Sequence, residues 1–77
     1  WVLFKLGELQ SAEKYINQAI ESGGGNDPEI NEHAGDIQKA LGSYEIATSF
    51  YEKAIILGGD KERIEKKIRE IRKEVDR

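Results

Sequence analysis

The only histidine of the chain lies among carboxylates in a way that could serve metal binding. Glu29 precedes His33 by four residues, and Asp36 follows it by three. On a helix this spacing brings the three side chains to one face, and imidazole together with carboxylates can hold Zn²⁺. A closed zinc site also needs a fourth ligand, and the sequence offers none at a suitable position. We therefore favour an exposed histidine beside two acids over a metal site, and we expect no cofactor.

Three consecutive glycines, Gly23 to Gly25, could cradle a phosphate group. A phosphate-binding loop also requires a Lys-Ser or Lys-Thr pair, or the glycine spacing of a dinucleotide site. The residues around this segment provide neither. The segment is therefore interpreted as a flexible connection that ends one helix and precedes the next.

Catalysis has no recognisable set of residues in this chain. There is no cysteine, and no Ser-His-Asp set stands in a suitable context. The many acidic residues belong to solvated helix faces, and so short a chain hardly encloses the pocket that an active site needs. We expect that the protein is not an enzyme.

Length and charge narrow the possible partners. The 77 residues suffice for one small domain. The 12 basic and 15 acidic residues give a formal net charge of −3, which argues against a nucleic-acid surface.

No apolar run approaches the roughly 18 residues of a membrane helix, and no signal-peptide pattern is present, so we expect no membrane insertion. The lack of cysteine leaves the cellular compartment undetermined.

An internal repeat organises the sequence. Several residues recur at a constant offset of 35 positions. The matched pairs are Leu6-Gly7 with Leu41-Gly42, Leu9 with Tyr44, Ala12 with Ala47, Tyr15 with Phe50, and Ala19-Ile20 with Ala54-Ile55. A fixed period of this size, without strand signals, is typical of a helical repeat array.

Helix signals divide the chain further. Helical apolar spacing predicts helices over residues 9–21, 28–41, 44–57 and 61–75. Asp27, Ser43 and Asp60 stand at the predicted N-caps, and Gly7 is expected to end the remnant of an earlier helix. In the last helix the apolar residues form a narrow stripe of Ile64, Ile68, Ile71 and Val75.

One glycine falls in the middle of a predicted helix. Gly35 costs about 1 kcal/mol there relative to Ala. This cost indicates that a neighbouring helix approaches closely at Gly35.

A DNA-binding helix-turn-helix is an alternative for two helices around a Gly turn, but the helix from Tyr44 offers only Lys53 as a basic residue, so we do not favour it.

These residues resemble the tetratricopeptide repeat. The shared features are Ala34-Gly35 in a first helix, Gly42 and Tyr44 at the turn, and Ala47, Phe50-Tyr51 and Ala54 in a second helix. Asn31 and Gln38 depart from the pattern, because the family often has larger aromatic residues there, and we expect weaker packing around them. The resemblance implies an all-α fold, in which antiparallel helix-turn-helix repeats stack as a short right-handed solenoid. It divides the single domain, residues 1–77, into a truncated repeat (1–26), a complete repeat (27–59) and a C-terminal capping helix (60–77).

The resemblance also implies a function. Such arrays are scaffolds for protein–protein interaction, whose first helices line a concave groove for a peptide or helix of a partner. Matching positions place thirteen residues in this groove: Trp1, Phe4, Lys5, Glu29, Glu32, His33, Asp36, Lys39, Arg63, Lys66, Lys67, Glu70 and Lys73. One subset of the family binds a C-terminal carboxylate through cationic residues, but Glu32 and Asp36 occupy that region here, so this activity is not expected. The alternative is a structural module that ends a larger solenoid or forms a homodimer.

The apolar start of the chain favours association. The sequence opens on Trp1-Val2-Leu3-Phe4 without an initiator Met, which indicates a piece of a longer protein. Each large apolar side chain left in water forgoes roughly 1.5–3 kcal/mol of burial. We therefore expect that Trp1, Leu3, Phe4 and Leu6 drive self-association at the N-terminal edge, for example as a symmetric dimer.

Overall fold

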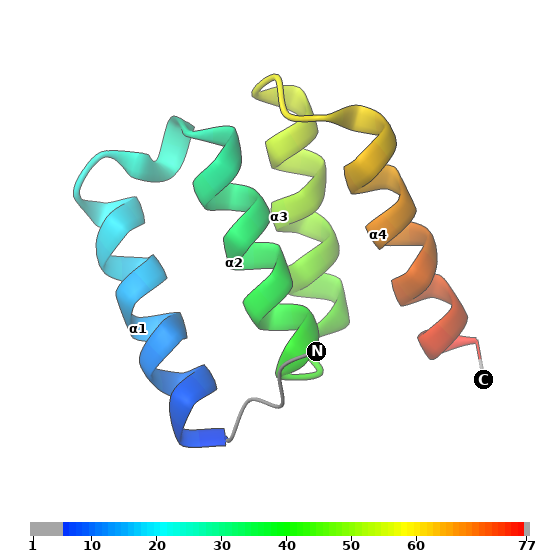
Figure 1. Ribbon diagram of the computed structural model, residues 1–77, viewed down its shortest axis with the longest axis horizontal. Helices are drawn as coiled ribbons and strands as arrows, with labels where there is room; N and C mark the ends of the chain where they lie inside the picture. Colours follow the sequence, from blue (N-terminus) through cyan, green and yellow to red (C-terminus); the bar gives the residue numbers. More distant parts are fainter. Residues whose placement is uncertain (1–5, 77) are drawn as a thin grey trace.

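Four α-helices follow one another along the described part of the chain and pack side by side (Figure 1). The computed structural model describes residues 6–76, and no strand occurs among them. The helices are α1 (Leu6–Glu21), α2 (Pro28–Ala40), α3 (Tyr44–Ile56) and α4 (Lys61–Val75), with a single 3₁₀ turn, η1 (Gly24–Asn26), between α1 and α2. The pair α2–α3 is the most extensively packed; α1 lies against α2, and α4 lies against α3. The all-α helical-repeat fold is confirmed.

Two aspartates begin their helices as the sequence predicts. The Asp27 side chain accepts a hydrogen bond from the backbone N–H of Glu29 at 2.8 Å, and Pro28 occupies the first helical position. The Asp60 side chain accepts from the N–H of Arg63 at 3.1 Å at the start of α4. Local sequence alone therefore fixes where α2 and α4 begin.

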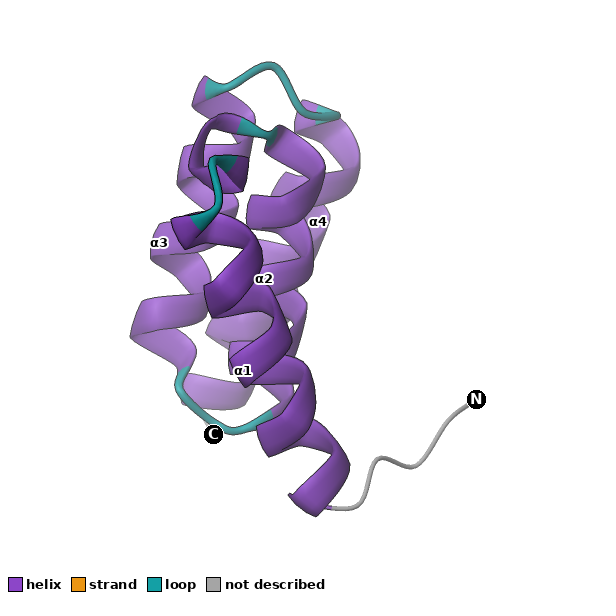
Figure 2. Ribbon diagram, turned by 90° about the vertical axis from the view of Figure 1, so that its left-hand side faces the viewer, coloured by secondary structure: helices purple, strands orange, loops and turns teal. Residues whose placement is uncertain are grey.

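The turn between α2 and α3 uses glycine rather than the predicted serine cap. Gly42 has a φ of 83°, a left-handed conformation that carries no Cβ penalty in glycine. Ser43 stands at the N-cap of α3, but its side chain makes no capping hydrogen bond. Its backbone N–H instead donates to the carbonyl of Gln38 at 2.9 Å and closes the end of α2. In Figure 2 the turn appears as a short loop between two helices.

The expectation that Gly7 ends a helix is wrong. Helix α1 begins at Leu6 and passes through Gly7, whose φ is not positive. Glycine permits a left-handed end without forcing one, so a match to Gly42 in the repeat does not fix the conformation of Gly7. The remnant helix that the sequence predicts before Gly7 lies largely outside the described residues.

The core is centred on a tyrosine that packs against a bare backbone. Tyr51, Ala47 and Ala54 of α3 have no exposed surface. A Cβ added at Gly35 would lie 2.5 Å from Cε1 of the Tyr51 ring, so the mid-helix glycine is explained by close approach. Ile64 and Ile71 of α4 extend this core.

Four large apolar side chains of the described residues are exposed outside the core: Tyr15, Ile46, Ile56 and Val75. Tyr15 is 73% exposed, whereas Phe50, which matches it in the repeat, is half-buried. Val75 is 60% exposed. It is the last residue of α4, so the buried stripe of this helix ends at Ile71.

Asn31 and Gln38 replace apolar packing with hydrogen bonds. The fully buried Asn31 amide donates to the carbonyls of Gly25 at 3.1 Å and Asp27 at 2.9 Å, which ties the glycine connection to α2. The Gln38 amide donates to the Glu13 carboxylate at 2.6 Å and links α1 to α2. The positions expected to weaken packing therefore make specific contacts.

The Gly35 contact can be tested by adding a methyl group. We expect Gly35→Ala to lower the free energy of unfolding by about 1–3 kcal/mol, because the methyl overpacks against Tyr51. Gly7→Ala is the matched control, since a Cβ there meets nothing within 4 Å. That control should gain up to about 1 kcal/mol from helix propensity. Urea unfolding followed by circular dichroism measures the free energy of unfolding of both variants. An equal gain in stability for Gly35→Ala and Gly7→Ala would contradict the close contact.

Candidate functional site

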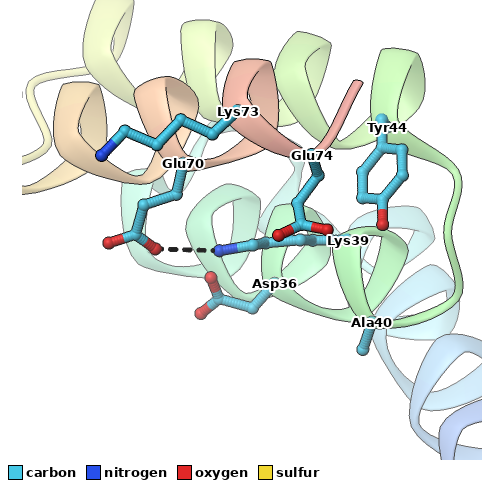
Figure 3. A pocket seen from close by; sticks show the side chains of 7 residues that line it. All are labelled: Asp36, Lys39, Ala40, Tyr44, Glu70, Lys73 and Glu74. Atoms are coloured by element: carbon cyan, nitrogen blue, oxygen red, sulfur yellow. Dashed lines mark hydrogen bonds and ion pairs between the residues drawn. The ribbon is translucent and has the colours of Figure 1, made fainter. Parts of the chain in front are cut away.

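Nine of the thirteen residues predicted for the groove gather on the facing sides of α2 and α4. Two adjoining depressions lie there, and we call them together the inner groove. The first, of about 400 Å³, is lined by Pro28, Glu29, Glu32, His33, Asp36, Gly59, Arg63 and Lys67. The second, of about 640 Å³, is lined by Asp36, Lys39, Ala40, Tyr44, Glu70, Lys73 and Glu74 (Figure 3). Lys66 lines neither, and Trp1, Phe4 and Lys5 lie outside the described residues.

Opposite charges meet across the first depression. The Glu32 carboxylate, on a residue only 7% exposed, accepts from Arg63 at 2.7 Å and 3.1 Å and from Lys67 at 2.8 Å. Lys67 also donates to both oxygens of Asp36, at 3.0 Å and 3.1 Å. We call Glu32, Asp36, Arg63 and Lys67 the ion-pair cluster. It contains two acids and two bases, so its formal charge is zero.

Long side chains, more than backbone contact, connect α2 to α4. The two helices are not among the closely packed helix pairs of the described residues. Arg63 and Lys67 reach from α4 to the acids of α2, and Lys39 reaches from α2 to Glu70 at 3.1 Å (Figure 3). The inner groove is therefore the space that these bridges span.

The pKa shifts follow from this pairing. The hydrogen bond from Arg63 is the largest influence on Glu32; with the help of Lys67 it outweighs burial and lowers the pKa of Glu32 below its usual value. Burial alone would lower the pKa of Lys67, but its hydrogen bonds to Glu32 and Asp36 leave that pKa raised. Both groups are therefore held in their charged forms.

Tyr51 connects the core to the ion-pair cluster. Its hydroxyl donates a hydrogen bond to a carboxylate oxygen of Asp36. Burial, and then this hydrogen bond, raises the pKa of the Tyr51 hydroxyl, which keeps it a neutral donor. The Lys67 ammonium also lies 5.9 Å from the centre of the Tyr51 ring. One tyrosine thus packs against Gly35 and orients an acid of the groove.

The three residues considered for a metal site share a face but do not form a cluster that could hold an ion. His33 Nε2 lies 3.6 Å from a carboxylate oxygen of Glu29, and both side chains are largely exposed. Asp36 is engaged by Lys67 and Tyr51 instead. Across residues 6–76, no group of three or more His, Cys, Asp or Glu is placed to hold a metal.

Tyr44 and Glu74 are two of the lining residues that were not predicted for the groove. Tyr44 is half-buried against the core and also closes one end of the second depression, beside Ala40 (Figure 3). The sequence did offer a signal for this position of Tyr44. Tyr44 directly follows the Gly42-Ser43 turn, where α3 starts beside the last turn of α2. Glu74 lies on α4 at the same end, and its charged surroundings in the sequence gave no sign of it.

The fold and the groove together define a class of protein. A stack of antiparallel helices, with a groove lined from alternate helices, is a helical-repeat scaffold. Among the described residues, no helix is both long and apolar enough to cross a membrane.

The comparisons with known proteins specify the family. The family model of the tetratricopeptide repeat matches residues 1–22 and 28–56, and the chain belongs to this family. Repeats of this family generally mediate protein–protein interactions and form scaffolds without catalytic function. Searches of curated proteins and of solved structures gave no match.

The buried acid makes stability depend on pH. A depressed pKa of Glu32 in the folded protein contributes stability above the unfolded value of about 4.3, and this contribution is lost as the pH falls further. At pH 7 we expect Glu32→Gln to cost about 1–3 kcal/mol, because the charged hydrogen bonds weaken. The difference from the unaltered chain should shrink below about pH 4.

Urea unfolding at pH 7, 5, 4 and 3 measures this difference. Glu29→Gln is the control on the same helix, since its side chain is 80% exposed and its ion pair within residues 6–76 is with the exposed His33. It should change stability little at any of these pH values. A cost of Glu32→Gln that stays constant from pH 7 to pH 3 would contradict the assigned charge state.

Proposed function

We propose that this chain is a protein-interaction module whose inner groove binds an extended segment of a partner polypeptide. The observation that carries this proposal is the pair of adjoining depressions between α2 and α4, joined at Asp36 and lined by nine of the predicted groove residues. Helix α2 has 13 residues and is about 20 Å long, at a rise of 1.5 Å per residue. A groove of that length takes about six residues of extended chain.

The charge balance of the groove suggests the chemistry of the partner segment. The ion-pair cluster is neutral, and Lys39 is matched by Glu70. A segment held by backbone hydrogen bonds and single side-chain contacts suits such a surface better than a run of like charges. Arg63 and Lys67 are engaged by acids, and the net charge is −3. We infer on these grounds that nucleic acid is not the partner.

The alternative, a structural or self-associating module, has support at another edge. Tyr15 on α1 is 73% exposed although its repeat equivalent is half-buried. An exposed aromatic beside other apolar residues marks a surface that a further polypeptide could cover. Self-association through Trp1, Leu3 and Phe4 stays a prediction, which sedimentation at several concentrations can test.

Charge reversal in the groove provides the functional test. Lys73 lines the second depression in the last turn of α4, and no ion pair within residues 6–76 depends on it. The test peptides are selected from a random library for binding to the unaltered chain. We expect Lys73→Glu to weaken their binding about fivefold or more, because a lost charged contact costs about 1 kcal/mol.

Lys53→Glu is the matched control, because Lys53 occupies the last turn of α3 and is exposed outside the inner groove. Isothermal titration calorimetry measures both variants, and their unfolding curves should agree. If Lys73→Glu and Lys53→Glu bind the selected peptides equally well, the inner groove is not the binding surface.

A further inference from the structure

The inner groove is neutral in its middle, at the ion-pair cluster, and differs in charge between its two ends. Helices α2 and α4 run in the same direction along it, because the pairs Glu32–Arg63 and Lys39–Glu70 follow one another in the same order on both helices (Figure 1). The first depression therefore lies where both helices begin, and the second lies where both end. The charges left unmatched at each end can thus be compared.

One acid marks the end of the groove at which the helices begin. Outside the ion-pair cluster, Glu29 and His33 are the titratable side chains that line the first depression. The Glu29 side chain is 80% exposed, and its contact with His33 at 3.6 Å is an ion pair only when the imidazole is protonated. Glu29 is therefore placed to accept a charge-assisted hydrogen bond from a cation of a partner.

Cations are in excess at the opposite end. The hydrogen bond and the charge of Lys39 lower the pKa of Glu70 against the effect of burial, and the charges of two further lysines lower it more. These two are Lys66 and Lys73, whose side chains have no hydrogen bond or ion pair within residues 6–76. In Figure 3, Lys73 lies beside Glu70 on α4, and the dashed line joins Glu70 to Lys39. Glu74, the other acid of α4 in this depression, takes part in an interaction of its own.

The acid at one end and the cations at the other are separated by a few residues of extended chain. Glu29 and Lys39 are ten positions apart on α2, which corresponds to about 15 Å at the rise of an α-helix. Glu70 is bonded to Lys39, so Glu70 and its basic neighbours lie at the far end of this distance. An extended polypeptide covers about 15 Å with about five residues.

We propose that the inner groove selects a partner segment by the order of its charges. A basic side chain of the segment lies at Glu29, and an acidic side chain about five residues away lies at Lys66 and Lys73. Uncharged residues suit the interval between them, because the ion-pair cluster that they cross is already neutral. This selectivity rests on the proposed binding of an extended segment in the inner groove. The charge order also sets how the segment lies, since the opposite placement brings like charges together at both ends.

The same two ends of the groove also suit the dipoles of their helices. Glu29 is in the first turn of α2, and Lys73 is in the last turn of α4. That role affects the stability of the fold and not the choice of peptide. Glu45 and Lys53 occupy the first and last turns of α3 and are exposed outside the inner groove. Reversing the charges of either pair keeps the net charge and disturbs helix ends alike, so the α3 pair is a matched control.

The test begins with a random library of short segments, each flanked by Gly-Ser linkers so that no chain terminus contributes a charge. Segments selected on the unaltered chain should carry a basic and an acidic residue about five positions apart. In synthetic peptides of these segments, exchanging the two charged residues should weaken binding about tenfold or more, because two attractive contacts become repulsive. Isothermal titration calorimetry measures the affinity of each peptide.

Protein variants then show which residues read the charge order. With Glu29→Lys and Lys73→Glu combined, the preference should reverse, so that the charge-exchanged peptide binds more tightly than the selected one. With Glu45→Lys and Lys53→Glu combined, the preference should stay as in the unaltered chain. Circular dichroism verifies that both double variants keep the helical fold.

Failure of the charge order can be told apart from failure of the groove itself. Peptides that shift the amide signals of Asp36 and Ala40 in the ¹⁵N-labelled chain, but lose less than about twofold in affinity on charge exchange, would overturn the charge order alone. A preference that the variant of Glu29 and Lys73 does not reverse would do the same. If no peptide is selected, or if the signal shifts lie only on other surfaces, the proposed function is overturned and the charge order with it.

Discussion

The contact between the Tyr51 ring and the backbone of Gly35 is the constraint on which the rest of the structure depends. It sets the separation of α2 and α3, the most closely packed pair of helices. It also places the Tyr51 hydroxyl at Asp36, which in turn receives Lys67 of α4. A packing requirement in the core is thereby passed on to the charged residues that line the inner groove.

The ion-pair cluster has two roles that are easily confused. Glu32 and Asp36 are placed where a partner could meet them, yet both are already matched by cations of α4. Removing one member of a nearly buried ion pair lowers the free energy of unfolding by more than the intact pair contributes to it. The reason is that the remaining charge is left without compensation. The cluster therefore positions α4. In the partner binding that we propose, recognition would fall to residues such as Lys73 and Tyr44, which line the groove without belonging to the cluster.

Sequence reasoning succeeded where a local rule or the repeat decides the outcome. The N-caps at Asp27 and Asp60 and the close approach at Gly35 follow from single residues and their neighbours. The groove residues could be assigned to facing helices, because repeat position fixes helix face. The division at residues 26 and 59, and the role of the groove, stay predictions.

The sequence could not supply what depends on three-dimensional neighbours. Gly7 and Gly42 match in the repeat, but only Gly42 ends a helix. Tyr15 and Phe50 match as well, but Tyr15 is exposed and Phe50 is half-buried. Which acid pairs with which base across α2 and α4 depends on side-chain reach, and no spacing in the sequence records it.

The coupling between Tyr51 and Lys67 tests this account most directly, since both act on Asp36. In a double-mutant cycle of Tyr51→Phe and Lys67→Met, followed by urea unfolding at pH 7, we expect a coupling free energy of about 0.5–3 kcal/mol. Such a value would show that the core tyrosine and the α4 lysine act through one network. Costs that add to within about 0.3 kcal/mol would mean that the groove charges are independent of the core, and would contradict the account.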